Sequence, residues 1–222
     1  MPKKAGVLFI SLGAVLILSA LLLLLRNQWE DFRAGQDAEM QLHEIQAAVW
    51  EKVDPVTPLP TGPEPTSPEE NCQENEPEMP PEESPEQTPA VTIDGYEYIG
   101  YLSIPDLGLE LPVMADWDYE RLKIAPCRHF GSSGTDDLVI AGHNYRTHFK
   151  FLSNLRAGAD VFFTDINGNV NQYALAKDPE LLAPDAVDAV QNSGYELVLY
   201  TCTPGRAARV VVFCDRVAQE TE

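Results

Sequence analysis

The hydrophobic pattern begins with a long apolar run near the N-terminus. Residues 5–25 contain no charged side chain, whereas Lys3 and Lys4 precede the run and Arg26 ends it. A helix rises ~1.5 Å per residue, so this run can cross the ~30 Å hydrocarbon core of a bilayer. We therefore predict a transmembrane helix over 5–25, within a membrane anchor of residues 1–26. A cleaved signal peptide is the alternative; its apolar region is typically shorter and ends in small residues, and no convincing cleavage site ends this run.

Residues 27–90 divide into two segments with different patterns. In 27–50, apolar residues recur among polar ones without proline, which predicts a juxtamembrane helix acting as a short stalk. Residues 51–90 hold 11 proline and 11 acidic residues. Such a composition buries too little apolar surface to offset the entropy cost of ordering. It predicts a Pro/Glu-rich disordered linker, with a reach on the order of 100 Å at ~3 Å per residue.

From residue 91 onward the pattern changes to short runs of β-branched, aromatic and aliphatic residues separated by turn signals. Strands are predicted at residues 98–104, 109–113, 138–141, 161–163, 170–176, 196–201 and 209–214. Short helices are predicted at residues 118–125, 148–155 and 182–191, with a hairpin turn at 165–169. Many strands and few helices indicate a mainly β fold, and we predict a single small antiparallel β-barrel over residues 91–222.

The chain is strongly acidic, with a formal net charge of −20 and an isoelectric point of about 4.4. Half of that charge lies in residues 51–90, where 1 basic and 11 acidic side chains give −10. A nucleic-acid partner needs a basic footprint, so we expect none, and the balance better fits an outer-surface protein. Because Lys3 and Lys4 precede the apolar run, the positive-inside rule favours a single-pass cell-membrane protein with a cytoplasmic N-terminus. The β-domain would then be extracellular.

The last two predicted strands place a thiol beside a cation. The first is followed by Cys202 and the second begins at Arg209, with a Pro204-Gly205 turn signal between them. If residues 203–208 form the loop, Cys202 and Arg209 are cross-strand neighbours with Cβ atoms ~4.5–5.5 Å apart. A nearby arginine favours the thiolate form, which is the nucleophile. A cysteine in an apolar strand is more often buried and inert, so it is the strand-end position beside Arg209 that favours a reactive thiol.

The motif that ends at Cys202 reads Val198-Leu-Tyr-Thr-Cys202, and Arg209 follows it. It resembles the Thr-Leu-x-Thr-Cys signature of the sortases, the cysteine transpeptidases of Gram-positive cell surfaces, with Val198 in place of the first Thr. Further sortase-like landmarks occur in order: Gly100-Tyr-Leu-Ser-Ile-Pro105, Ala141-Gly-His143-Asn144, Phe149-Lys-Phe-Leu-Ser-Asn-Leu155, Tyr173 and Pro184. The resemblance covers the whole β-region and implies an eight-stranded barrel, one strand more than the pattern predicts.

The resemblance also implies a catalytic dyad with an arginine. Cys202 is expected to attack a peptide carbonyl, His143 to donate a proton to the leaving amine, and Arg209 to neutralise charge on the carbonyl oxygen. The expected function is a membrane-anchored cysteine transpeptidase with an extracellular catalytic domain. It would cleave a Leu-Pro-x-Thr-Gly-like sorting signal through a Cys thioester and transfer the protein to an amine of the cell wall or of a pilin. The short loop after Cys202 favours a class B-like or pilin-type enzyme over the housekeeping class.

Two other functions remain open: an extracellular cysteine peptidase with water as acceptor, and a non-catalytic surface interaction module in which Cys202 is structural. We expect no cofactor and no metal, because the Cys and His spacings are not those of a zinc site.

Other Cys, His and Arg residues are weaker candidates for the site. His148 is expected to be a capping or surface residue of the helix at 148–155, and Arg206 a solvated cation at the loop tip. His129 and His43 have no evident partner in the sequence. The remaining question is Cys127 and Cys214, which could form a disulfide outside the cell or stay free.

Overall fold

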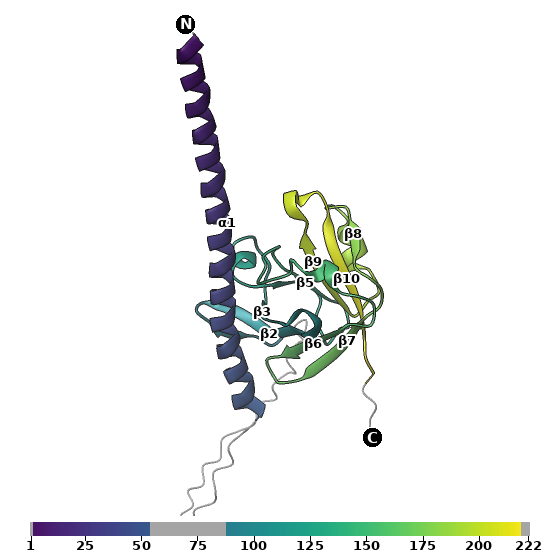
Figure 1. Ribbon diagram of the computed structural model, residues 1–222. Helices are drawn as coiled ribbons and strands as arrows, with labels where there is room; N and C mark the ends of the chain where they lie inside the picture. Colours follow the sequence, from purple (N-terminus) through teal and green to yellow (C-terminus); the bar gives the residue numbers. More distant parts are fainter. Residues whose placement is uncertain (1, 54–87, 219–222) are drawn as a thin grey trace, which may run out of the picture.

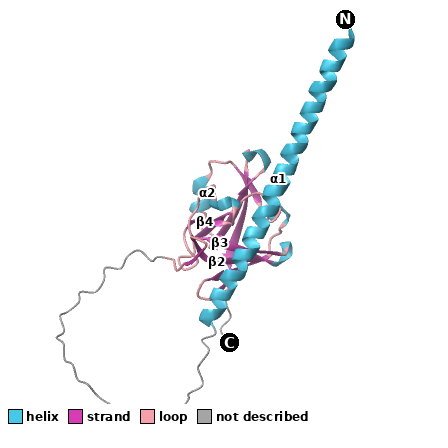
Figure 2. Ribbon diagram, turned by 90° about the vertical axis from the view of Figure 1, so that its left-hand side faces the viewer, coloured by secondary structure: helices cyan, strands magenta, loops and turns pink. Residues whose placement is uncertain are grey.

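The computed structural model describes residues 2–53 and 88–218, so most of the linker predicted at 51–90 lies outside the described residues. Residues 88–218 form a closed β-barrel with a few short helices, as the sequence predicts (Figures 1 and 2). The strands are β1 (Val91–Ile93), β2 (Tyr96–Ile104), β3 (Leu109–Met114), β4 (Cys127–Phe130), β5 (Leu138–Ala141), β6 (Asp160–Asp165), β7 (Val170–Leu175), β8 (Glu180–Leu182), β9 (Leu197–Cys202) and β10 (Arg209–Arg216).

Eight of these strands close the barrel. Their order is β2-β3-β4-β5-β9-β10-β7-β6, and β6 pairs with β2 to complete the ring. Two pairs are parallel, β3 with β4 and β5 with β9, and the remaining pairs are antiparallel. The short strands β1 and β8 add to the outside, on β2 and β10 respectively.

The barrel strand that the hydrophobic pattern misses is β4. It has four residues, Cys-Arg-His-Phe, without the apolar alternation of a typical strand. Its register on β5 shifts between Arg128 and Phe130, so a bulge falls at His129. Tertiary pairing on both sides, with β3 and β5, therefore makes this segment a strand despite its weak local pattern.

The three helices predicted in the barrel region are shorter than expected. The segment at 118–125 is a 3₁₀ turn at Arg121–Lys123, and the segment at 148–155 is a 3₁₀ turn at Leu152–Asn154. The segment at 182–191 begins at the end of strand β8 and is helical only in α2 (Val187–Gln191). Pairing of β8 with β10 takes the first part of that segment into the sheet.

Two apolar layers stabilise the barrel, and alternation along β9 supplies both. Leu197 and Leu199 point into the barrel interior, whereas Val198 and Tyr200 belong to a second cluster on the outer face of β4, β5, β9 and β10. By the same period of two, the side chain of Cys202 lies on the outer face. The candidate nucleophile is thus outside the barrel, where a substrate can reach it.

Helix α1 (Pro2–Val53) joins the apolar run and the predicted juxtamembrane segment in one continuous element. Its C-terminal half lies along the barrel, and its N-terminal half projects beyond the barrel (Figure 1). One stripe of α1 faces the barrel and is buried, comprising Ala34, Ala38, Gln41, Leu42, Ile45 and Val49. The spacing of these residues is that of one helical face, so the juxtamembrane helix predicted as a short stalk packs against the barrel.

Polar contacts fix the docked half of α1. The Tyr98 hydroxyl donates a hydrogen bond to the Gln41 side-chain oxygen in the buried interface. Near the other end of the docked region, the Arg146 backbone N–H donates to an Asp31 carboxylate oxygen at 2.6 Å, and the Thr147 hydroxyl donates to the Asp31 carbonyl at 3.2 Å. These bonds set the position of α1 along its axis as well as its rotation.

The projecting half of α1 exposes its apolar side chains on every side from Leu12 to Leu25. By length and composition, α1 is the one helix in the described part of the chain that could cross a membrane. A predominantly apolar, unburied helical surface of this kind is suited to lipid rather than water.

Candidate active site

Cys202 and Arg209 are directly paired at the loop end of the β9–β10 hairpin, which is the register that the sequence predicts. The loop between them is closed at its base, where the Thr203 backbone N–H donates to the Ala208 carbonyl at 2.8 Å. The Thr203 hydroxyl and the Ala208 N–H add a second contact at 3.0 Å. The Cys202 side chain is half-buried, so the thiol is both held and reachable.

His143 reaches the same rim of the barrel through a parallel strand pair. Strands β5 and β9 run side by side with Ala141 opposite Tyr200, and the Gly142 N–H donates to the Tyr200 carbonyl at 3.0 Å. His143 and Cys202 each lie two residues beyond that last pair. Carboxyl ends of adjacent parallel strands meet at one edge, so the structure brings His143, Cys202 and Arg209 to one end of the barrel.

Gly142 is required where the chain leaves β5 toward His143. A Cβ atom at this position would lie 2.3 Å from the Phe149 ring, which is completely buried. The close approach of the ring explains why glycine precedes the histidine, and the packed ring fixes the direction in which His143 leaves the strand.

The His143 ring is half-buried and stacked on an aromatic neighbour. Its centroid lies 3.9 Å from that of the Tyr145 ring, with an interplanar angle of 14°. Burial, followed by the Arg206 cation, lowers the pKa of His143, and Glu30 and Asp31 of α1 act in the opposite direction. The neutral imidazole is therefore favoured near pH 7. Among residues 12–51 and 88–218, no partner hydrogen-bonds the buried Nδ1 atom.

Arg209 is held beside Cys202 by an aromatic face. Its guanidinium carbon lies 5.0 Å from the centroid of the Tyr200 ring. Within the part of the chain that the structure describes, Arg209 has no ion-pair partner, and its Nε atom is buried without a hydrogen bond. The cation is thus positioned without being neutralised.

Sequence reasoning missed Tyr200 and His129 as parts of this environment. His129, expected to have no partner, has its Nδ1 atom 2.8 Å from the Tyr200 hydroxyl. The two residues lie on β4 and β9, which are separated by β5. No local pattern signals a contact across an intervening strand.

His148 is placed differently from its expected surface position. Its side chain is 1% exposed, close to α1 and the Tyr145 ring, and neither ring nitrogen has a hydrogen-bond partner among the described residues. Burial, followed by the nearby His143, lowers the pKa of His148 to about 4. Packing of α1 against the barrel buries His148, and the sequence alone could not predict that α1 packs at this place.

His148 should make the fold sensitive to acid. Between pH ~6.5 and pH 4 the unfolded chain binds a proton at His148 and the folded chain does not. The free energy of unfolding should therefore be highest above pH ~6.5 and should fall by up to about 3 kcal/mol as the pH is lowered to 4. In the His148→Leu variant this part of the loss should disappear. Urea unfolding of the detergent-solubilised protein at pH 7 and pH 4.5 measures the difference. An equal fall in both proteins would contradict the assignment.

The remaining candidates are Arg206, His43, Cys127 and Cys214. Arg206 is exposed at the loop tip and His43 is exposed on α1. Cys127 and Cys214 are free, buried thiols. They lie on β4 and β10, three strand spacings or about 14 Å apart, which exceeds the ~7 Å limit for a disulfide. In the described residues, no group of three or more His, Cys, Asp or Glu side chains could hold a metal ion.

A family model described as Sortase domain matches residues 102–217, which is more than half of the 222 residues. The chain belongs to the sortase family. Sortase A of Bacillus anthracis is 29% identical to this sortase over 139 residues, covering 59% of this chain and 65% of that relative. The crystal structure of sortase C-3 from Streptococcus pneumoniae shares 27% identity with a TM-score of 0.50, covering 57% of this chain and 66% of that one.

This sortase therefore spans just under two thirds of the length of these relatives. The family and the barrel fold predicted from the sequence are confirmed by these matches and by the strand order. The two relatives are a sortase A and a sortase C, and the predicted class B-like or pilin-type subclass stays a prediction.

Proposed function

We propose that this protein is a membrane-anchored cysteine transpeptidase that uses Cys202, His143 and Arg209. It cleaves a Leu-Pro-x-Thr-Gly-like sorting signal and transfers the protein to an amine of the cell wall or of a pilin. The observation that carries the proposal is the direct pairing of Cys202 with Arg209 at the end of the barrel that His143 also reaches. Among the described residues, Arg209 forms no ion pair with a carboxylate.

The proposed reaction proceeds in two halves. The Cys202 sulfur attacks the scissile carbonyl carbon while the neutral His143 ring takes the thiol proton. When the carbon–nitrogen bond breaks, His143 returns that proton to the leaving amine, and a thioester remains on Cys202. An acceptor amine then attacks the thioester, loses a proton through His143, and releases Cys202 as the thiol. The lowered pKa of His143 supports the neutral ring as the starting form.

Arg209 supplies the positive charge for the carbonyl oxygen. The oxygen gains negative charge as the tetrahedral intermediate forms, and a preorganised cation stabilises that charge more than it stabilises the ground state. A planar guanidinium can donate two N–H groups in parallel, and no carboxylate of the described chain competes for them.

Helix α1 supports a position of this site close to the bilayer. Asp31 contacts the loop that follows His143, and the apolar run ends at Leu25. Six residues of helix span about 9 Å, so the catalytic end of the barrel faces the side from which α1 projects, as Figure 1 shows for the β9–β10 loop. We propose a cytoplasmic N-terminus, which puts the barrel outside the cell and within reach of membrane-bound substrates.

Product analysis distinguishes this proposal from its alternatives. The full-length protein in detergent is incubated with tagged sorting-signal peptides, with and without glycine peptides or a lysine derivative as the acceptor amine. We expect a new amide product whose yield rises with amine concentration. Release to water alone, at every amine concentration, would instead identify a cysteine peptidase. Absence of both products and of a thioester would favour the non-catalytic surface module.

A further inference from the structure

The Arg209 guanidinium lies over the face of the Tyr200 ring. The two residues are diagonal neighbours on the outer face of the hairpin, since Tyr200 pairs with Val211 and Cys202 pairs with Arg209. The guanidinium carbon is 5.0 Å from the ring centroid. No ion pair holds Arg209 among residues 12–51 and 88–218. A change in the orientation of the ring would therefore move the cation.

His129 fixes the hydroxyl end of the same ring. Tyr200 is 5% exposed, and its hydroxyl lies 2.8 Å from the His129 Nδ1 atom. Burial raises the pKa of Tyr200 to about 12, against an opposing effect of Arg209. Burial and the Arg209 cation lower the pKa of His129. Near pH 7 the hydrogen bond therefore joins a neutral phenol to a neutral imidazole.

Aromatic packing holds His129 in its turn. The His129 ring centroid lies 3.9 Å from that of Phe130 and 5.0 Å from that of Trp117. His129 sits at the bulge of β4, which turns its ring out of the regular strand pattern, and the ring reaches across β5 to the Tyr200 hydroxyl. The result is a line of contacts from β4 through β9 to the cation on β10.

We infer that His129 is a positioning residue, which orients the Arg209 guanidinium beside Cys202 through the Tyr200 ring. The inference rests on the proposed function, in which Arg209 binds the carbonyl oxygen. An aromatic face directs the cation while leaving its N–H donors free for substrate, whereas a carboxylate in the same place would occupy them.

Kinetics of two conservative variants and their double variant test the inference. In Tyr200→Phe the ring remains without its hydroxyl, and in His129→Phe the aromatic volume remains without Nδ1. Turnover of a sorting-signal peptide by the full-length protein is normalised to the titrated reactive thiol. We expect each variant to lower kcat about 5- to 10-fold with little change in KM, and the double variant to be no slower than either single one. His129→Asn, which restores a polar group near the hydroxyl, should recover most of kcat.

Tyr173→Phe is the matched control. Tyr173 makes the same kind of pair at the far end of β10, with the Arg216 guanidinium carbon 5.0 Å from its ring and its hydroxyl 3.1 Å from Arg216. We expect its kcat per reactive thiol to equal that of the wild type. Additive losses in the His129 and Tyr200 double variant, an equal loss in Tyr173→Phe, or undiminished turnover in His129→Phe would each overturn the inference.

Nitrogen NMR of labelled histidine provides a readout that does not depend on turnover. Tyr200→Phe and Arg209→Gln should both shift the His129 ring resonances, and Tyr173→Phe should leave them unchanged. If the wild-type protein showed no turnover, the proposed function would be overturned. The NMR result alone would then show whether His129, Tyr200 and Arg209 are in contact. Unchanged His129 resonances in Tyr200→Phe would overturn the proposed contact between His129 and Tyr200.

Discussion

Cys202→Ala should abolish both cleavage and transfer of a sorting-signal peptide while leaving the barrel folded. The variant removes the sulfur atom that forms the thioester in the proposed reaction, and the half-buried strand-end position tolerates a small side chain. Burial raises the pKa of Cys127 to about 12 and also raises the pKa of Cys214, so neither of these buried thiols can replace Cys202. Mass spectrometry of trapped acyl-enzyme measures the loss directly.

The partners of Cys202 should fail in different ways. His143→Ala should slow turnover by roughly 10²- to 10⁴-fold, the usual range for general acid–base catalysis, while Cys202 remains alkylatable. Arg209→Lys keeps the charge but loses the planar fork, so much of the rate should be lost. The control is Arg206→Ala at the exposed loop tip. Wild-type turnover in Arg209→Lys together with an inactive Arg206→Ala would move the cation's role to the loop and refute the assignment.

Ile45→Ala should destabilise the protein by about 2–5 kcal/mol, the range for removing a fully buried aliphatic side chain. Ile45 is 0% exposed and lies in the outer cluster with Ile93, Tyr98 and Met114. The loss should appear in urea unfolding of the detergent-solubilised protein, followed by tryptophan fluorescence. It arises because the cavity weakens the contact between α1 and the barrel.

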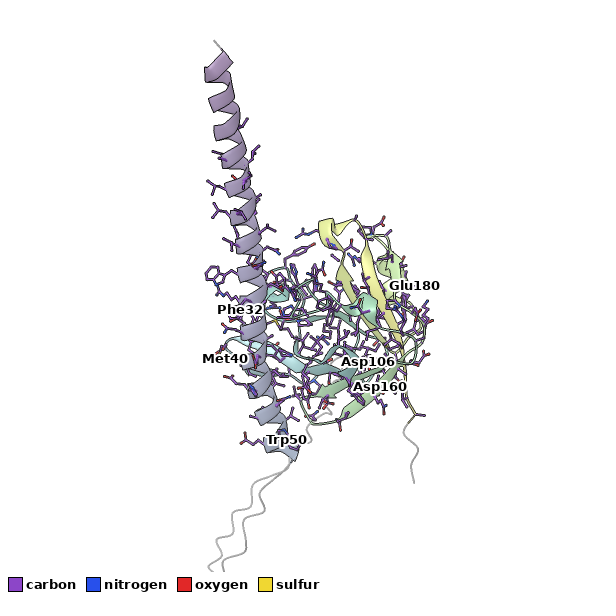
Figure 3. The ribbon with its side chains drawn as sticks, viewed as in Figure 1. Phe32, Met40, Trp50, Asp106, Asp160 and Glu180 are labelled. Carbon is purple, nitrogen blue, oxygen red and sulfur yellow. The ribbon has the colours of Figure 1, made fainter. Side chains whose placement is uncertain are left out.

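Met40→Ala is the control for this helix. Met40, labelled in Figure 3, is 56% exposed on α1, and surface truncations of this kind typically change stability by less than about 0.5 kcal/mol. If both variants unfold at the same urea concentration as the wild type, α1 is not a structural part of the barrel in solution.

The sequence predicts most of the fold because local signals and tertiary pairing agree there. The β9–β10 hairpin shows this: its alternating apolar residues and its Pro-Gly loop predict the register that places Cys202 opposite Arg209. Strand β4 could not be predicted, since four residues with a bulge acquire strand structure only from their neighbours. The predicted helix over 182–191 is helical only in α2, and its first residue, Leu182, belongs to β8 because it pairs with β10.

The candidate site, like the fold, has a part that local sequence signals predict and a part that depends on contacts between distant elements. Cys202, His143 and Arg209 follow from residue type, strand ends and the motif around them. The contacts of Tyr200 with His129 and of His148 with the α1 interface connect elements distant in sequence, and no spacing rule predicts them. The domain limits proposed for the membrane anchor and for the barrel region remain predictions. The burial of α1 residues against the barrel argues for keeping 27–53 in any folded fragment.

Because α1 is unbroken, its length sets both the distance of the barrel from the apolar segment 5–25 and the direction in which the barrel faces around the helix axis. Each helical residue adds ~1.5 Å and turns the chain by ~100°. Two residues inserted between Arg26 and Asp31 would therefore swing the catalytic rim to roughly the opposite side of the helix axis. An insertion of one full turn, about 3.6 residues, would keep the direction of the rim around the helix axis and move the rim ~5.4 Å along that axis. The number of residues in this short stretch therefore fixes the orientation of the catalytic rim, and only changes in length by whole helical turns preserve that orientation.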